Sequence, residues 1–149
     1  MKRDYDTLFG RVAPQADRAA AMQRFVDAAW ELFGGAGVSW IGFYLPGGQG
    51  EMVLGPCRNK PACSPIGLYG VCGQVFRSMK PKVVADVREL GPNYIACDPR
   101  DQSEVVIPLF ESSGRCWGVL DVDSYEVGAF SEADVAGLTT ALRAAGLTQ

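Results

Sequence analysis

A β-hairpin predicted over residues 103–123 constrains the fold more than any other part of the chain. Two runs rich in aliphatic residues, Ser103–Glu111 and Arg115–Asp123, flank the turn-forming sequence Ser112-Ser113-Gly114-Arg115. Because side chains alternate between the two faces of a strand, one face of this hairpin carries a row of apolar side chains that suits a core covered by helices. These side chains are Val105, Ile107, Leu109, Leu120 and Val122.

The opposite face of the hairpin gathers three acidic side chains. The antiparallel register opposes Glu104 with Asp123 and Val106 with Asp121, whether the turn holds two residues or four, so the three acids share one end of that face. Like charges this close destabilise a fold unless something compensates them. One interpretation is a solvated sheet end. The other is a pocket that binds a cation, with one acid kept protonated by its neighbours and able to donate a proton.

Two aromatic side chains favour the pocket. In the strand-like run Val38–Leu45, Trp40 and Tyr44 share a face with Gly42 between them. The glycine, which lacks a side chain, is predicted to leave room for a ligand. Ordinary core packing of a strand explains the same residues equally well.

The remaining elements predict an α+β fold. The expected helices, marked by the spacing of apolar residues, cover residues 17–33, 71–79 and a last segment opened by Ser131 and closed by Gly146. The expected strands outside the hairpin cover residues 38–45, 52–55 and 82–87, and residues 88–102 are expected to form a long loop. We therefore predict a single domain over residues 1–149, an antiparallel sheet with the N- and C-terminal helices packed on one face and a ligand pocket on the other.

Composition argues against several classes of function. The net charge of −3, with no basic run, argues against nucleic acid as a partner. No apolar run approaches the roughly 20 residues of a membrane span, and none follows the first basic residues, so neither a membrane anchor nor a signal peptide is predicted. We therefore expect a cytoplasmic protein with reduced cysteines. Without histidine or a Cys-x-x-Cys pair, no metal site is predicted, and chemistry must rest on sulfur, carboxylates or a borrowed cofactor.

Three cysteines lie in glycine- or proline-rich contexts that favour reactivity: Lys60-Pro61-Ala62-Cys63, Gly70-Val71-Cys72-Gly73 and Ile95-Ala96-Cys97-Asp98. Cys72 lies at the start of a predicted helix, where the helix dipole stabilises a thiolate, whereas the charge of Asp98 opposes ionisation of Cys97. Local electrostatics alone therefore favour Cys72 as the reactive sulfur. Cys57 and Cys116 are expected to be inert small hydrophobes.

Together with these cysteine contexts, three further motifs make the chain resemble the free methionine-(R)-sulfoxide reductases, which are single GAF domains. The motifs are Trp40-Ile-Gly-Phe-Tyr44, Ser103-Glu-Val-Val-Ile-Pro108 and Gly118-Val-Leu-Asp-Val-Asp-Ser124. The resemblance covers nearly the whole chain. It implies reduction of free L-methionine-(R)-sulfoxide to methionine without a cofactor, with thioredoxin as the reductant.

The resemblance also implies a role for each cysteine. Cys97 is the nucleophile, Cys63 resolves it through an intramolecular disulfide, and Cys72 is a third redox cysteine able to assist. The choice of Cys97 overrides the electrostatic preference for Cys72, because placement beside the bound sulfur matters as much as a resting pKa. Asp121 or Asp123 is the expected proton donor. The implied substrate pocket consists of Trp40, Tyr44, Glu104, Asp121 and Asp123.

The chain departs from the family at Tyr94 and in its cysteine spacing, which is one residue shorter from Cys63 to Cys72 and one longer from Cys72 to Cys97, and two other functions stay open. The family commonly has histidine where this chain has Tyr94, which leaves any role of that imidazole in doubt. One alternative function is a GAF module that senses a small molecule without chemistry. The other is a thiol redox switch, whose cysteines respond to an oxidant and alter the binding of a partner. The oligomeric state, including a homodimer, is left open by the sequence.

Overall fold

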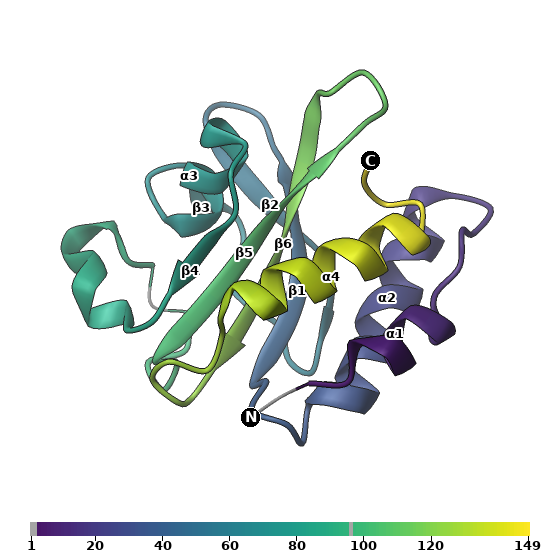
Figure 1. The fold of residues 1–149 in the computed structure, drawn as a ribbon. Helices are drawn as coiled ribbons and strands as arrows, with labels where there is room; N and C mark the ends of the chain where they lie inside the picture. Colours follow the sequence, from purple (N-terminus) through teal and green to yellow (C-terminus); the bar gives the residue numbers. More distant parts are fainter. Residues whose placement is uncertain (1–2, 96) are drawn as a thin grey trace.

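The computed structural model describes residues 3–95 and 97–149, which form one curled sheet with helices on both faces (Figure 1). The strands are β1 (Trp40–Pro46), β2 (Glu51–Arg58), β3 (Ile66–Gly67), β4 (Lys82–Val84), β5 (Ser103–Phe110) and β6 (Cys116–Ser124). The helices are α1 (Tyr5–Arg11), α2 (Arg18–Phe33), α3 (Val71–Ser78), α4 (Glu132–Ala144) and the 3-10 segment η1 (Val87–Asn93). The strand order is β3-β2-β1-β6-β5-β4, and all neighbours are antiparallel, which confirms the predicted α+β class.

The β5–β6 hairpin forms in the predicted register. Glu104 pairs with Asp123, and Val106 pairs with Asp121. The register shifts only beside the turn, between Leu109 and Phe110. The sequence pattern therefore predicted correctly which hairpin side chains face the helices and which face away from them.

Three helices cover one face of the sheet. Figure 1 shows α4 crossing in front of the strands, with α1 and α2 beside it. The main hydrophobic core lies beneath these helices, where the rings of Phe25 and Phe43 meet edge to face with centroids 6.0 Å apart. The last helix begins after Ser131, as predicted, and a capping box forms there: the Ser131 hydroxyl accepts from the Ala133 amide at 3.3 Å and the Ser131 amide donates to Asp134 at 2.9 Å.

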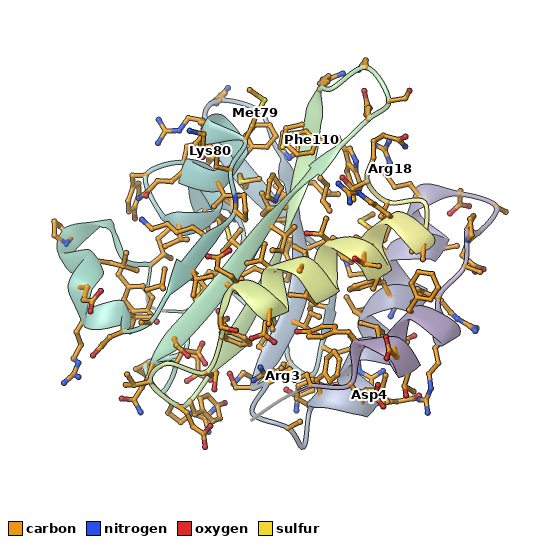
Figure 2. The ribbon with its side chains drawn as sticks, in the orientation of Figure 1. Arg3, Asp4, Arg18, Met79, Lys80 and Phe110 are labelled. Atoms are coloured by element: carbon orange, nitrogen blue, oxygen red, sulfur yellow. A yellow bond between two sulfur atoms is a disulfide. The ribbon has the colours of Figure 1, made fainter. Side chains whose placement is uncertain are left out.

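The first helix, α1, is absent from the sequence-based prediction, because seven residues are too few for a helical period to stand out. The helix begins after Asp4, whose carboxylate accepts a hydrogen bond from the Thr7 amide at 3.0 Å. Just before it lies the buried Arg3 (Figure 2). Its guanidinium donates to Asp134 at 3.0 Å and lies 4.8 Å from the ring centroid of Phe130. The N-terminal segment is thereby tied to the start of α4.

The other face of the sheet carries α3, which packs on β5 and β6 (Figure 1). A second, smaller core lies there and includes Cys72, Val75 and Val106. The strand expected at residues 82–87 ends at Val84, and the loop expected at 88–102 is replaced at its start by η1. In the part of the chain that the structure describes, no helix has the length and hydropathy needed to cross a membrane.

Candidate active site

A small cavity lies on the face of the sheet that carries α3, away from α2 and α4. Its volume is about 50 Å³, which is room for a few water molecules. Strands β1, β5 and β6 and helix α3 contribute lining residues, and so does the chain between η1 and β5 through Cys97 and Asp101. The lining residues are Trp40, Tyr44, Ile66, Val71, Cys72, Val87, Tyr94, Ile95, Cys97, Asp101, Glu104, Asp121 and Asp123.

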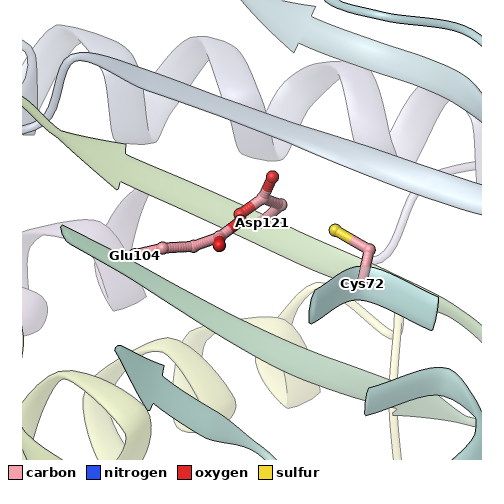
Figure 3. A group of neighbouring side chains, drawn as sticks. All are labelled: Cys72, Glu104 and Asp121. Carbon is pink, nitrogen blue, oxygen red and sulfur yellow. The ribbon is translucent and has the colours of Figure 1, made fainter. Parts of the chain in front are cut away.

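The three predicted acidic side chains all line this cavity. Glu104 is 8% exposed and Asp121 is 6% exposed, while Asp123 is half-buried. One oxygen of Glu104, one of Asp121 and the sulfur of Cys72 lie within 4.8 Å of one another, and the three side chains converge (Figure 3). Within the described residues, Asp121 Oδ1 has no hydrogen-bond partner. Burial of this kind excludes the interpretation of a solvated sheet end.

The electrostatic environment of the cavity favours the protonated form of its carboxyl groups. Burial raises the pKa of Asp121 well above its usual range, and the charges of Asp123 and Glu104 raise it further. The pKa of Asp123 is raised in the same way, by burial and then by the charges of Glu104 and Asp101. The site therefore favours a bound cation, a bound proton or both. A thiol and two carboxyl groups at this spacing could also hold a metal ion, and this set has no signature in residue spacing.

The aromatic side chains lie on the predicted face, but they do not leave the predicted gap. Trp40 pairs with Asp123, and Gly42 pairs with Asp121. A Cβ added at Gly42 would lie 2.3 Å from the Trp40 indole, so the indole itself fills the space that the sequence assigned to a ligand. The absence of a side chain at Gly42 is therefore required by Trp40, which crosses over it. Tyr44 lies beside Trp40, with ring centroids 6.1 Å apart.

The two aromatic side chains also hold the loop that carries Cys63. Trp40 Nε1 donates a hydrogen bond to the Lys60 carbonyl at 2.9 Å, and the Tyr44 hydroxyl donates to the Cys63 carbonyl at 2.8 Å. The backbone around Cys63 is thus fixed to β1 from the cavity side.

A disulfide joins Cys63 to Cys97, with their Cα atoms 5.6 Å apart. The two residues come from separate loops, 34 positions apart in the chain, and Cys97 lines the cavity together with the acidic side chains. The structure therefore brings together the two cysteines that the family resemblance pairs, and one of them, Cys97, lines the same cavity as the three acids.

The electrostatic preference for Cys72 is wrong. Cys72 does lie in the first turn of α3, but it is only 5% exposed and its sulfur faces the acids. Burial raises the pKa of its thiol, and the charges of Asp121 and Glu104 raise it further, so the helix dipole does not yield a thiolate here. The objection to Cys97 also weakens, because the carboxylate of Asp98 is paired with Lys60 and Arg100.

Some site residues escape sequence reasoning. Asp101 lines the cavity and accepts a hydrogen bond from the Ser39 hydroxyl at 2.8 Å, and burial raises its pKa to about 6. No motif marks Asp101, since it lies in the irregular segment before β5. Tyr94 also lines the cavity, at the position where the related family commonly has histidine. Cys116 is buried in β6 and is not among the residues that line the cavity.

Comparison with known proteins shows the family to which the chain belongs. The family model described as GAF domain matches residues 15–148. The chain is 41% identical over 105 residues to GAF domain-containing protein A of Dictyostelium discoideum, covering 70% of this chain and 65% of that protein. It is 39% identical over 103 residues to free methionine-R-sulfoxide reductase of Escherichia coli, covering 68% of this chain and 60% of that one. The chain thus spans less than two thirds of the length of each of these relatives.

A solved structure matches over more of its length. It is the X-ray structure of free methionine-R-sulfoxide reductase from Neisseria meningitidis in complex with its substrate, with a TM-score of 0.81 and 36% identity. The match covers 95% of this chain and 84% of that one. The chain therefore belongs to the GAF domain family and is a homologue of the free methionine-R-sulfoxide reductases.

Proposed function

We propose that this protein reduces free methionine-(R)-sulfoxide to methionine with the thiol of Cys97. The observation that carries the proposal is the Cys63–Cys97 disulfide at a cavity lined by three acidic side chains. An oxidisable cysteine pair beside a cavity that favours protons and cations suits a substrate with both a sulfoxide and an ammonium group. The names of the related enzymes from Neisseria meningitidis and Escherichia coli support the same substrate.

In this proposal the acids select the free amino acid. The substrate ammonium lies against Glu104, Asp121 and Asp123, and its methyl group lies near Trp40, with Tyr44 completing the pocket. A methionine within a peptide has no ammonium to place there, so peptide-bound substrate is rejected.

The chemistry begins with attack of the Cys97 sulfur on the sulfoxide sulfur. A protonated carboxyl group, Asp121 or Asp123, donates to the sulfoxide oxygen, and the proton lost by Cys97 restores the carboxyl group. The oxygen leaves with Cys97 as a sulfenic acid, so the substrate sulfur gains two electrons and the cysteine sulfur loses them. Cys63 then displaces hydroxide from the sulfenic acid, which forms the disulfide and releases water.

An external dithiol closes the cycle. Thiol–disulfide exchange transfers the two electrons of the dithiol to Cys63 and Cys97, and thioredoxin is the reductant that we propose. Cys72 is kept as an assisting thiol. Its raised pKa makes it a poor first nucleophile, so it acts only after Cys97 has been oxidised.

The experiment that tests the proposal is a thioredoxin-coupled assay with three substrates. We expect turnover of the R form of free methionine sulfoxide and none of the S form or of a peptide-bound version. Replacement of the nucleophile (Cys97→Ser) should reduce turnover by at least about 1,000-fold, because a serine hydroxyl at neutral pH is not a thiolate. The matched control is Cys116→Ala, which changes a buried cysteine in β6 away from the cavity and should keep the wild-type rate.

The same assay separates the rival functions. A sensor module would bind the amino acid without consuming it. A redox switch would form the Cys63–Cys97 disulfide with peroxide but leave methionine sulfoxide unchanged. Either result, or full activity in Cys97→Ser, would refute the reductase proposal.

A further inference from the structure

We propose that Lys60 and Asp98 act as a clamp that keeps Cys63 beside Cys97 when the disulfide is reduced. The clamp would set how readily the disulfide closes. Its kinetic consequence rests on the proposed reductase function, whereas its effect on the disulfide equilibrium does not. Lys60 and Asp98 are positioning residues in this proposal, since neither is among the residues that line the cavity.

The ion pair links the same two loops as the disulfide. Lys60 lies three residues before Cys63, and Asp98 follows Cys97 directly. Lys60 Nζ donates to the Asp98 carboxylate, so a non-covalent link runs beside the covalent one. Reduction breaks only the covalent link. The two thiols would then remain neighbours instead of separating with their loops.

Asp98 is fixed on several sides. Its side chain is only 10% exposed, and it accepts hydrogen bonds from the Arg100 side chain at 3.0 Å and from the Tyr125 hydroxyl at 2.9 Å. Lys60 also donates to the Tyr125 hydroxyl, at 2.7 Å. Tyr125 directly follows β6, so both members of the clamp are held at one end of the sheet.

The loops that carry Cys63 and Cys97 differ in the other hydrogen bonds that hold them. The Cys63 loop is held to β1 by Trp40 and Tyr44, as described above. The Cys97 segment makes local backbone hydrogen bonds: the Cys97 amide donates to Ile95, and the Asp101 amide donates to the Asp98 carbonyl. Among the described contacts of residues 97 and 98, the hydrogen bonds of the Asp98 side chain are therefore the main non-covalent links that join this segment to Lys60 and to the end of the sheet.

Lys60 and Asp98 both keep their charges over the pH range in which thiols titrate. The Arg100 side chain and Lys60 hold the pKa of Asp98 well below its usual range, and Asp98 raises the pKa of Lys60. Both partners of the ion pair therefore stay charged in the pH range in which the disulfide is formed and reduced. Holding two groups together raises their effective concentration, which favours closure in both rate and equilibrium.

The first arm of the test measures the disulfide equilibrium without substrate. Wild type, Lys60→Met and Asp98→Asn are equilibrated in dithiothreitol buffers, and the fraction of Cys63–Cys97 disulfide is read by thiol alkylation and mass spectrometry. We expect both variants to shift the equilibrium toward the dithiol by about fivefold to tenfold. This corresponds to a potential about 20 to 30 mV less reducing. Lys60→Arg keeps the charge and should restore most of the wild-type value.

The matched control is Arg11→Met. Arg11 forms an exposed ion pair with Glu31 at 3.4 Å, between α1 and α2. Its loss should leave the disulfide equilibrium unchanged. The double variant Lys60→Met with Asp98→Asn should shift the equilibrium no further than Asp98→Asn alone, because the Lys60–Asp98 interaction is already lost in that single variant. A wild-type equilibrium in Lys60→Met, or an equal shift in Arg11→Met, would overturn the clamp.

The second arm follows a single turnover of the reduced enzyme. Lys60→Met should release methionine at the wild-type rate but close its disulfide about fivefold to tenfold more slowly. The Cys97 sulfenic acid should therefore accumulate and be trapped by dimedone. Loss of the methionine-forming step to the same extent would overturn the assignment, since the pair would then support substrate binding. If the protein does not reduce methionine sulfoxide, the equilibrium arm still decides the clamp.

Discussion

The two faces of the β5–β6 hairpin are buried to nearly the same degree but carry opposite kinds of side chain. On the helix-covered face, Val105 and Leu120 are fully buried in an apolar core. On the cavity face, Glu104 and Asp121 are 8% and 6% exposed. Burying an aliphatic side chain stabilises a fold by about 1.5–3 kcal/mol, whereas burying a carboxylate beside two others costs free energy.

This contrast shows how the domain tolerates a reactive cavity. The larger core, between the sheet and α1, α2 and α4, supplies the stability, and the same strands hold the acids at fixed spacing on the opposite face. On the cavity face the pKa of Asp121 is raised and, within the described residues, its Oδ1 has no hydrogen-bond partner, at a cost that the other face offsets. Four predictions test this division of roles.

The largest expected effect on stability comes from the helix-covered face. Leu120→Ala should lower the free energy of unfolding by about 3 kcal/mol, because it leaves a cavity in a fully packed region. Urea denaturation measures this loss. At 25 °C the folded variant should keep its turnover of methionine sulfoxide within about twofold. A large loss of activity at unchanged stability would show that the two faces are not separate in role.

The matching change on the cavity face is Asp121→Asn, which should reduce turnover without reducing stability. Turnover should fall by about 100-fold, because an amide cannot donate a carboxyl proton to the sulfoxide oxygen. The free energy of unfolding at pH 8 should rise by about 1 kcal/mol, because one buried like charge is removed. Steady-state kinetics and urea denaturation on the same preparation test both parts.

The raised pKa of Asp121 determines how its contribution to the free energy of unfolding changes with pH. Since the pKa of Asp121 is raised in the folded state, the folded protein binds this proton more tightly than the unfolded chain does. Its contribution is fully present below the unfolded pKa of about 4 and is lost as pH rises toward the folded pKa. The wild type should therefore lose stability between pH 5 and pH 8 more steeply than Asp121→Asn. An equal slope in the two proteins would contradict the assignment.

The smallest expected effect concerns the reactivity of the free cysteines. In the disulfide form at pH 8, iodoacetamide should label the half-buried Cys57 about tenfold faster than Cys72, which is buried and faces the acids. Mass spectrometry of the alkylated peptides measures both rates. Asp121→Asn should speed labelling of Cys72 by a few-fold. Faster labelling of Cys72 than of Cys57 in the wild type would show that the helix dipole outweighs burial after all.

Local sequence patterns predicted the parts of the fold that repeat or pair locally. The alternation along β5 and β6 predicted the register and the position of all three acids, and Ser131 marked the start of α4. Short elements had no such signal. The seven residues of α1, the two residues of β3 and the 3-10 turns of η1 are all too short for a period to appear.

Errors at the site arise because residue spacing does not show which side chains meet in space, whether they are near or distant in the chain. Gly42 gives space, but only the fold shows that the Trp40 indole occupies it. Cys72 lies at a helix start, but only the fold turns its thiol toward Asp121 and Glu104. Asp101 lies in irregular chain with no motif, and its burial beside Ser39 comes from tertiary packing alone.

The sequence by itself determined that the hairpin has an apolar face and an acidic face, because strand alternation is a local property of the backbone. Through its motifs it also named the two cysteines that are joined by a disulfide. Only the tertiary structure decided which cysteine is exposed and which is buried against the carboxylates, and how Asp98 is neutralised by Lys60. The physical reason is that burial and charge depend on neighbours in space, and these neighbours come from loops far apart in the chain.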